Sequence, residues 1–148
     1  MSEIANSPSV NKRLPTFLFE KRYEDIHYVI DRLYDECIKE SLFLGIYLND
    51  EFCGIAEMYG FRDDMHKVSL GVRLREKFWG RGITAEALRM MIDYLYGETD
   101  IEIITASTLV GNKAAAAAAR KAGFTLVVHA SPEDWGYDEP CPTDKWIA

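Results

Sequence analysis

An apolar strand pattern, a basic glycine turn and an amphipathic helix pattern follow one another in the middle of this 148-residue chain. In the segment 68–74, valine and leucine occupy every second position, which predicts a β-strand. Gly80-Arg81-Gly82 follows, and the run 86–96 carries its apolar residues on one side of a predicted helix. Glycine lets the backbone approach a ligand closely, and the N–H groups of a helix N-terminus attract anions. This order of segments therefore predicts a phosphate-binding site.

The charge around this turn differs in sign from that of the whole chain. The net charge is -7, yet the turn is surrounded by Lys67, Arg73, Arg75, Lys77 and Arg81. A basic island on an acidic protein favours a specific anionic ligand and argues against nucleic-acid binding. Taken alone, a Gly-x-Gly pair is most often an ordinary turn. It is no P-loop, and it is no dinucleotide fingerprint, because Ala85 and Glu86 stand where the last glycine is required.

The rest of the chain alternates between strand and helix patterns. A helical pattern covers 23–42, and a hairpin with the turn Asn49-Asp50 joins predicted strands at 43–48 and 52–60. Further strands are predicted at 101–108, 125–130 and 145–147, with a proline-containing loop before the last. Asn112 begins a second helix, which holds the alanine run 114–119 and ends at Gly123. Helix propensity explains this alanine run as well as close packing or close ligand approach does.

This ordered set of segments resembles the GNAT acyltransferase superfamily. The resemblance is carried by Lys77-Phe78-Trp79-Gly80-Arg81-Gly82 at the turn and by Asn112 with Lys121-Ala122-Gly123-Phe124 at the second helix. The Trp-Gly-Arg-Gly sequence at the turn is similar to that of the branch that contains ribosomal-protein and spermidine N-acetyltransferases. Over about residues 20–130 the resemblance implies the mixed α/β (α+β) GNAT-like acyl-CoA N-acyltransferase fold. That fold has a mostly antiparallel, twisted sheet, splayed at its centre and flanked by helices.

We expect a flexible arm at 1–15 and one GNAT-like domain at 16–148, because the first residues are polar and contain two prolines. Members of the family place a strand and a helix before the segment that starts here near residue 20, so this part is expected to be shortened. An exposed sheet edge would follow, or a partner chain would cover it, and a homodimer is one such arrangement.

The composition argues against a membrane-spanning, secreted, disulfide-rich or metal-binding protein. No apolar run approaches the roughly 18 residues that a membrane helix needs, and the first ten residues lack the features of a signal peptide. The three cysteines are widely spaced, which favours neither a disulfide framework nor a metal site. We therefore expect a cytoplasmic protein with no bound metal and no membrane partner.

The resemblance implies acetyl-CoA as the cosubstrate. Its diphosphate is expected at the main-chain N–H groups of Trp79, Gly80, Arg81, Gly82, Ile83, Thr84 and Ala85. Its pantetheine arm is expected to pair with the backbone of Val72, Arg73 and Leu74, in a gap beside the 101–107 strand. Asn112 is expected to contact the donor, and it is equally well explained as a helix N-cap.

The acceptor is expected to be a primary amine: a small amine, a polyamine or a protein N-terminus. An alkyl ammonium has a pKa near ~10 and must lose a proton before it attacks a thioester. Glu57 is the preferred base, since its apolar row predicts a raised pKa, although a strand glutamate is more often exposed or ion-paired. Tyr59 is the second candidate. Trp135 and Tyr137, in the late loop, are candidates for the acceptor pocket, while Glu133 and Asp134 of that loop either steer a cationic acceptor or simply keep the loop solvated.

One departure from the family bears on catalysis. Many relatives place a tyrosine seven residues after the asparagine to protonate the leaving thiolate, and this chain has Ala119 there. A thiol ionises near ~8.5, so either the thiolate leaves without a dedicated acid and the reaction is slower, or Tyr94, Tyr137 or water supplies the proton. The alternative function is an acyl-CoA-binding module without catalysis.

Overall fold

The structure is a computed structural model that describes residues 41–135 and 137–148. The expectations for the arm at 1–15, for a shortened first strand and helix, and for most of the helical pattern at 23–42 lie outside the described residues. The last two residues of that pattern, Ser41 and Leu42, belong to a strand, so the expected helix does not reach them.

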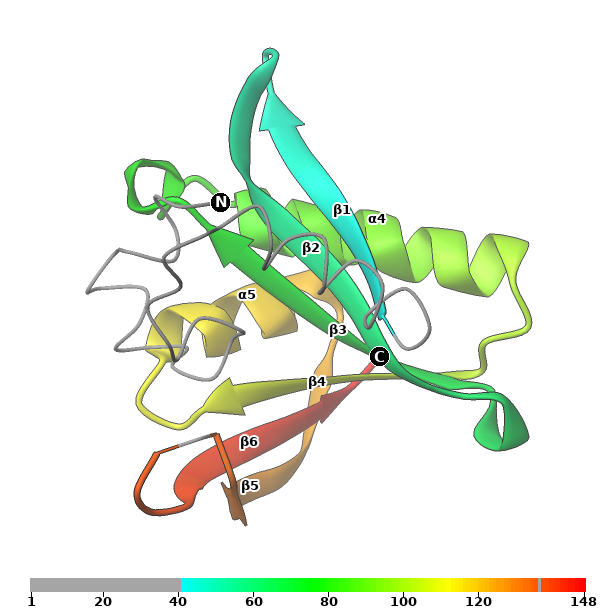
Figure 1. Ribbon diagram of the computed structural model, residues 1–148, viewed down its shortest axis with the longest axis vertical. Coiled ribbons are helices and arrows are strands. Elements are labelled where there is room, and N and C mark those ends of the chain that lie inside the picture. The colour runs from blue at the N-terminus through cyan, green and yellow to red at the C-terminus, as the bar shows by residue number, and fades with distance from the viewer. Residues whose placement is uncertain (1–40, 136) are drawn as a thin grey trace, which may run out of the picture.

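A six-stranded mixed sheet forms the framework of the described part (Figure 1). Its spatial order is β1-β2-β3-β4-β6-β5. The strands are β1 (Ser41–Leu48), β2 (Glu51–Arg62), β3 (Lys67–Leu74), β4 (Ile103–Leu109), β5 (Thr125–Glu133) and β6 (Cys141–Ile147). Every neighbouring pair is antiparallel except β3 and β4, which run parallel. The expected mixed, mostly antiparallel sheet is confirmed.

Two helices cover one face of this sheet: α4 (Ile83–Glu98) and α5 (Lys113–Ala122). Figure 1 shows both behind the strands. The core they bury includes a row that crosses the sheet in register, Met58, Leu70, Ala106 and Trp146. Burial of such apolar side chains contributes roughly 1.5–3 kcal/mol each for the larger ones. Short 3₁₀ turns (Asp63–Met65 and Glu76–Phe78) flank β3.

Local turn chemistry explains where the elements end. Asn49 and Asp50 both have left-handed backbone angles, with φ of 50° and 62°, as a two-residue hairpin of type I′ requires. The Asn112 side chain accepts a hydrogen bond from the Ala115 N–H at 3.2 Å and so caps the start of α5. Gly123, with φ of 105°, ends the helix in the left-handed conformation. The hairpin and both helix ends agree with the sequence predictions.

The expected proline loop after residue 130 is largely wrong, because β5 continues to Glu133 and β6 begins at Cys141. Pro132 and Pro142 stand opposite each other in the register. The Pro142 carbonyl points away from β5 and accepts a hydrogen bond from the Val110 N–H at 3.0 Å. In an antiparallel strand the N–H and C=O of one residue point to the same neighbouring strand. The N–H that Pro142 lacks would therefore point away from β5, so no hydrogen bond to β5 is lost at this proline.

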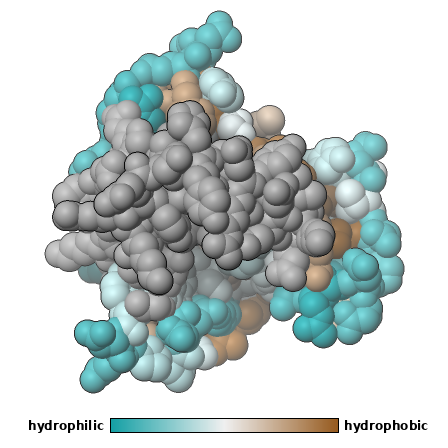
Figure 2. All heavy atoms as spheres, in the orientation of Figure 1, coloured by the Kyte–Doolittle hydropathy of each residue, from teal (hydrophilic) through white to brown (hydrophobic). Residues whose placement is uncertain are grey.

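The sheet opens between its two parallel strands. Pairing of β3 with β4 ends at Leu70 and Ala106, although β3 continues to Leu74 and β4 to Leu109. Figure 1 shows the ends of these two strands diverging. The splayed centre that the sequence resemblance implied is therefore present. In Figure 2 the protruding tip of the β1–β2 hairpin is hydrophilic, and hydrophobic residues lie nearer the middle of the molecule.

Candidate functional site

A cleft of about 340 Å³ lies between the end of β3, the turn before α4, and α5. It brings together every residue that the sequence predicted for the donor. These are Val72, Arg73, Leu74, Trp79, Gly80, Arg81, Gly82, Ile83, Thr84, Ala85 and Asn112. Residues separated by up to forty positions in sequence thus line one cavity, which we call the donor cleft.

Main-chain N–H groups are exposed to this cleft at the start of α4. Within the described residues, no backbone oxygen accepts from the amides of 80–85, and the bond from the Glu86 N–H to the Gly82 carbonyl is the first of the helix. Gly80 and Gly82 adopt φ of 72° and 79°, and no heavy atom lies within 4 Å of where a Cβ would stand. A run of unpaired amides at a helix N-terminus is suited to an anion.

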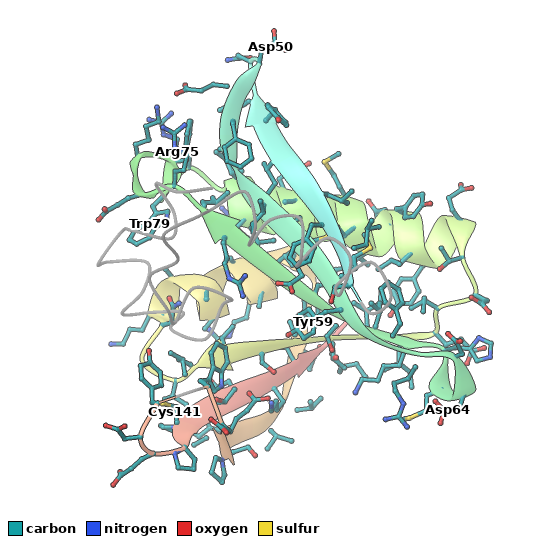
Figure 3. All side chains as sticks on the ribbon, in the orientation of Figure 1. Asp50, Tyr59, Asp64, Arg75, Trp79 and Cys141 are labelled. Atoms are coloured by element: carbon teal, nitrogen blue, oxygen red, sulfur yellow. The ribbon has the colours of Figure 1, made fainter. Side chains whose placement is uncertain are left out.

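Trp79 differs from the expectation in one respect. Its main-chain N–H already donates to the Glu76 carbonyl at 3.0 Å, so this amide is not available to a phosphate. Its indole Nε1 donates to the Leu74 carbonyl at 3.0 Å and fixes the ring at the end of β3. Figure 3 shows Trp79 and Arg75 together at this corner.

Basic side chains gather around Phe78, which lines the donor cleft, and two of them, Arg75 and Lys77, pair with Glu51. The cationic groups of Arg75, Lys77 and Arg81 lie 5.8, 5.1 and 5.3 Å from the centre of the Phe78 ring. Arg81 lines the donor cleft, and Lys121 of α5 lines it as well. Two further positive charges beside unpaired amides raise the local affinity for an anionic ligand.

The alanine run of α5 is used for close packing and for an open cleft wall, the explanation that the sequence left open beside plain helix propensity. Ala116 and Ala119 are buried against the core, while Ala114, Ala115 and Ala117 line the donor cleft. Small side chains therefore allow both close helix packing and close approach of a ligand. The sequence did not identify these alanines or Lys121 as lining residues.

The main chain of β3 offers hydrogen-bonding groups to the gap. The Arg75 N–H donates to the Cys53 carbonyl of β2 at 2.8 Å. Because backbone groups alternate in direction along a strand, Arg73 also faces β2, whereas Val72 and Leu74 face the gap. Among the described strands, none pairs with this edge of β3 beyond Leu70. Two of the three residues expected at the gap are thus placed there by their main chain, and Arg73 is not.

A second cleft of about 290 Å³ lies on the other side of the gap, and we call it the acceptor cleft. Glu57 and Tyr59 of β2 line it, as does Trp135 of the late loop. The two clefts share the lining residues Val72, Arg73, Thr84, Asn112 and Ala115. They therefore adjoin each other at the splayed part of the sheet, and we call the two clefts together the passage.

Glu57 and Arg73 form a mostly buried ion pair in the acceptor cleft. Arg73 Nη1 lies 3.5 Å from Glu57 Oε2, with side-chain exposures of 16% and 11%. Burial raises the pKa of the Glu57 carboxyl, and the charge of Arg73 partly opposes this. The predicted raised pKa is confirmed, and the ion-paired alternative holds as well. The sequence placed the Arg73 charge in the basic island around the turn and did not reveal that this side chain pairs with Glu57.

Tyr59 is the other predicted catalytic side chain. Burial, together with the charges of Glu57 and Glu133, raises the pKa of Tyr59 to about 12. Its phenol therefore stays protonated near neutral pH, which favours a hydrogen-bond donor over a base. Gly71 faces Glu57 across the strands, and a Cβ there would lie 3.5 Å from Oε2 of Glu57 and 3.6 Å from the Tyr59 ring. The missing side chain leaves space between them, and Figure 3 shows Tyr59 near the middle of the sheet.

The opposite wall of the acceptor cleft is a polar network that the sequence did not reveal. Lys145 Nζ donates to Ser107 Oγ at 3.1 Å and forms an ion pair with Glu133. The indole Nε1 of Trp135 donates to Glu133 Oε2 at 3.0 Å and to Thr143 Oγ1 at 2.9 Å. Only the pairing of β6 between β4 and β5 brings these distant residues together.

The described part of the chain holds no group of three histidine, cysteine, aspartate or glutamate residues arranged to bind a metal ion. In the same residues, every helix is too short or too polar to cross a bilayer.

A family model of the acetyltransferase (GNAT) domain matches residues 1–125 of the chain. The chain is 25% identical over 80 residues to "Putative ribosomal N-acetyltransferase YdaF" from Bacillus subtilis (strain 168), a match that covers 54% of this chain and only 44% of that relative's length.

Solved structures share the fold. The spermidine N-acetyltransferase of Vibrio cholerae, in complex with CoA and spermine, superimposes with a TM-score of 0.79 at 15% identity, covering 98% of this chain and 85% of that one. The microcin C7 self-immunity acetyltransferase MccE, in complex with acetyl-CoA and AMP, gives a TM-score of 0.80 at 18% identity, covering 98% and 82%.

Proposed function

We propose, since the chain belongs to the GNAT acetyltransferase family, that it transfers an acetyl group from acetyl-CoA to a primary amine. The transfer takes place by direct attack of the amine while donor and acceptor are bound together. One observation carries this proposal: the passage that runs from the unpaired amides of 80–85, through the β3–β4 gap, to the Glu57 carboxyl.

The donor follows this passage. Its diphosphate lies against the amides of 80–85, where the helix N-terminus and Arg81 stabilise the negative charge. Its pantetheine arm adds to the edge of β3 that faces the gap, through the backbone groups of Val72 and the N–H of Leu74, whose carbonyl already accepts from the Trp79 indole. Support comes from two structures of the same fold whose bound ligands are CoA and acetyl-CoA.

The thioester then lies in the gap, beside the N–H of Val72. Negative charge develops on the carbonyl oxygen during attack, and a fixed amide in a site shielded from water stabilises that charge. Glu57 takes a proton from the acceptor ammonium, directly or through water, and its raised pKa suits this role near neutral pH.

The lining of the acceptor cleft favours a cationic acceptor. The three carboxylates of this lining, Glu57, Glu133 and Asp134, outnumber the two cations that pair with them, Arg73 and Lys145, and Trp135 supplies an aromatic surface. Small amines, polyamines and protein N-termini all present an ammonium group of this kind. The proposal extends to a cytoplasmic location, where free thiols such as Cys53 and Cys141 persist, and to a homodimer, which light scattering would detect.

An acyl-CoA-binding protein without catalysis is the second candidate, because Ala119 lines the acceptor cleft where many relatives are expected to have a tyrosine. Thiol release from acetyl-CoA, followed across a panel of amines, distinguishes the two candidates. Amine-dependent release supports the enzyme. Tight acetyl-CoA binding by calorimetry without release for any amine would establish the binding protein instead.

A further inference from the structure

Ser107 occupies a particular position at the mouth of the gap. Pairing between β3 and β4 ends at Ala106, so Ser107 is the first residue of β4 at the opening. It lies opposite Lys145 in the register of β4 with β6. Glu57 belongs to β2 and lines the same acceptor cleft from the other wall. An acyl carbon in the gap would therefore lie between Glu57 and Ser107.

The Ser107 side chain points to the face of the sheet that is opposite α4 and α5. Ala106, its neighbour, is buried in the core under the helices, and side chains alternate along a strand. Thr105 Oγ1 and Ser69 Oγ form a hydrogen bond of 2.9 Å on that opposite face. Ser107 and Lys145 share this face with them.

The hydrogen bonds around Ser107 leave its proton available. The ammonium of Lys145 can only donate, so Ser107 Oγ is the acceptor of their 3.1 Å bond. Within the described residues, no group accepts a bond from the Ser107 hydroxyl. Glu133 holds Lys145 in place through the ion pair. A hydroxyl that accepts from a cation on one side is polarised to donate on its other side.

We propose that Ser107 donates the proton that the departing sulfur takes, and that Lys145 replaces it through the existing hydrogen bond. Ser107 is then a catalytic residue, while Lys145 acts through it. This inference rests on the proposed acetyl transfer, and it supplies the proton donor that Ala119 cannot provide.

The protons balance over one turnover. The ammonium of the acceptor loses one proton through Glu57 to solvent, its nitrogen attacks the thioester carbon, and the C–N bond forms as the C–S bond breaks. The second proton of the nitrogen passes to Glu57, and the electron pair of the C–S bond goes to sulfur. Sulfur takes the proton of Ser107 while Ser107 takes one from Lys145 in the same step, so no free alkoxide forms. Afterwards Lys145 takes up one proton from solvent and Glu57 gives one up, so these two exchanges cancel. The proton that the ammonium lost first is the one proton released overall.

Other donors in the cleft fit less well. Ala119 has no exchangeable proton, and Glu57 accepts protons on the opposite wall. Tyr59 lies on the same wall as Glu57, and within the described residues no group hydrogen-bonds to its phenol to replace a lost proton, as Lys145 does for Ser107. The Trp135 indole N–H is already bonded to Glu133 and Thr143.

The test compares two donors that differ only in the leaving atom: acetyl-CoA and its selenium analogue. A selenolate is a far weaker base than a thiolate and leaves without a proton. Ser107→Ala should lower kcat with acetyl-CoA about 10²-fold, a magnitude typical of lost general acid catalysis. It should leave the rate with the selenium analogue and the KM for both donors nearly unchanged. Lys145→Met should show the same donor dependence to a smaller degree.

Controls separate proton donation from structure. Ser107→Thr retains the hydroxyl and should restore most of the acetyl-CoA rate. Ser69→Ala removes a hydroxyl from the same face, two residues before Gly71, and should affect neither donor. Equal losses of Ser107→Ala with both donors, or no loss with either, would overturn the inference while wild-type turnover still supported acetyl transfer. If wild type releases no thiol with any amine, the proposed function itself fails.

Discussion

Arg73 reaches across from β3 to Glu57 of β2, and the two charged groups lie 3.5 Å apart in a largely buried setting. Isosteric replacement by Glu57→Gln keeps the shape of this side chain and removes its basicity. We expect kcat to fall at least about 10²-fold, as is typical when a general base is lost. The rise of kcat/KM with pH that reflects Glu57 ionisation should disappear. An unchanged rate and pH profile would remove Glu57 from its role.

The same carboxyl should make stability depend on pH. Its pKa is raised in the folded state above its ordinary value of 4.5, so the folded state holds the proton more tightly than the unfolded state. The contribution of Glu57 to the free energy of unfolding should therefore be largest below 4.5 and decrease as pH rises through its folded pKa. Urea unfolding of wild type and Glu57→Gln across this window measures the difference. A difference that stays constant with pH would contradict the shift.

Gly54 allows β2 and β3 to approach closely at the edge of the gap. A Cβ there would overlap the Arg73 carbonyl oxygen and lie 2.8 Å from Leu74 Cα, both main-chain atoms. Gly54→Ala should destabilise the fold by about 1–3 kcal/mol and weaken acetyl-CoA binding, because β3 must shift. Urea unfolding and calorimetry test both effects.

Gly97 provides the matched control for that substitution. It lies inside α4 with no heavy atom within 4 Å of its Cβ position. Gly97→Ala should stabilise the protein by up to about 1 kcal/mol, because alanine has the higher helix propensity, and should leave donor binding intact. Equal effects of the two substitutions would show that close approach at Gly54 is unimportant.

Gly71 should set the space for the acceptor. A single methyl group makes only ordinary contacts of 3.5 Å or more with Glu57 and Tyr59, so Gly71→Ala should fold normally. Gly71→Leu would fill the space between these side chains and should raise the KM for the amine while leaving the Kd for acetyl-CoA within about 3-fold. Initial-rate kinetics and calorimetry separate the two constants. A larger change in donor affinity than in acceptor KM would place the acceptor elsewhere.

The strands, turns and helices around the donor cleft could be predicted because the residues that specify each of them are close together in the sequence. Alternating apolar residues, the Asn49-Asp50 turn and the Asn112 cap each act within a few residues. The splay of the sheet was predicted only through the resemblance that the ordered motifs bear to the GNAT superfamily. Ser107 and Lys145 escaped prediction, since their contact depends on strand pairing 38 positions apart. The pairing of Arg73 with Glu57 escaped prediction because the two become adjacent only through the register of β2 with β3.

Proline misled the prediction for a different reason. Pro132 and Pro142 favour loops when their missing N–H groups would be needed for pairing. The direction of the Pro142 carbonyl shows that its nitrogen faces away from β5, so the ladder tolerates it. The assembled sheet decides which of the two neighbouring strands the backbone N–H and C=O of a residue point to. The sequence of a single strand does not contain this information.

Asn112 caps α5 and is also predicted to contact acetyl-CoA, and two substitutions separate these two roles. Its side chain caps α5 and lines both clefts. Asn112→Ala removes the cap and should cost about 1 kcal/mol of stability, measured by urea unfolding. Asn112→Ser keeps a capping oxygen and should retain that stability, while its shorter side chain withdraws from the donor. If Asn112 contacts acetyl-CoA, both variants should bind it more weakly by a similar factor. If the asparagine is only a cap, donor affinity in Asn112→Ser should equal that of wild type.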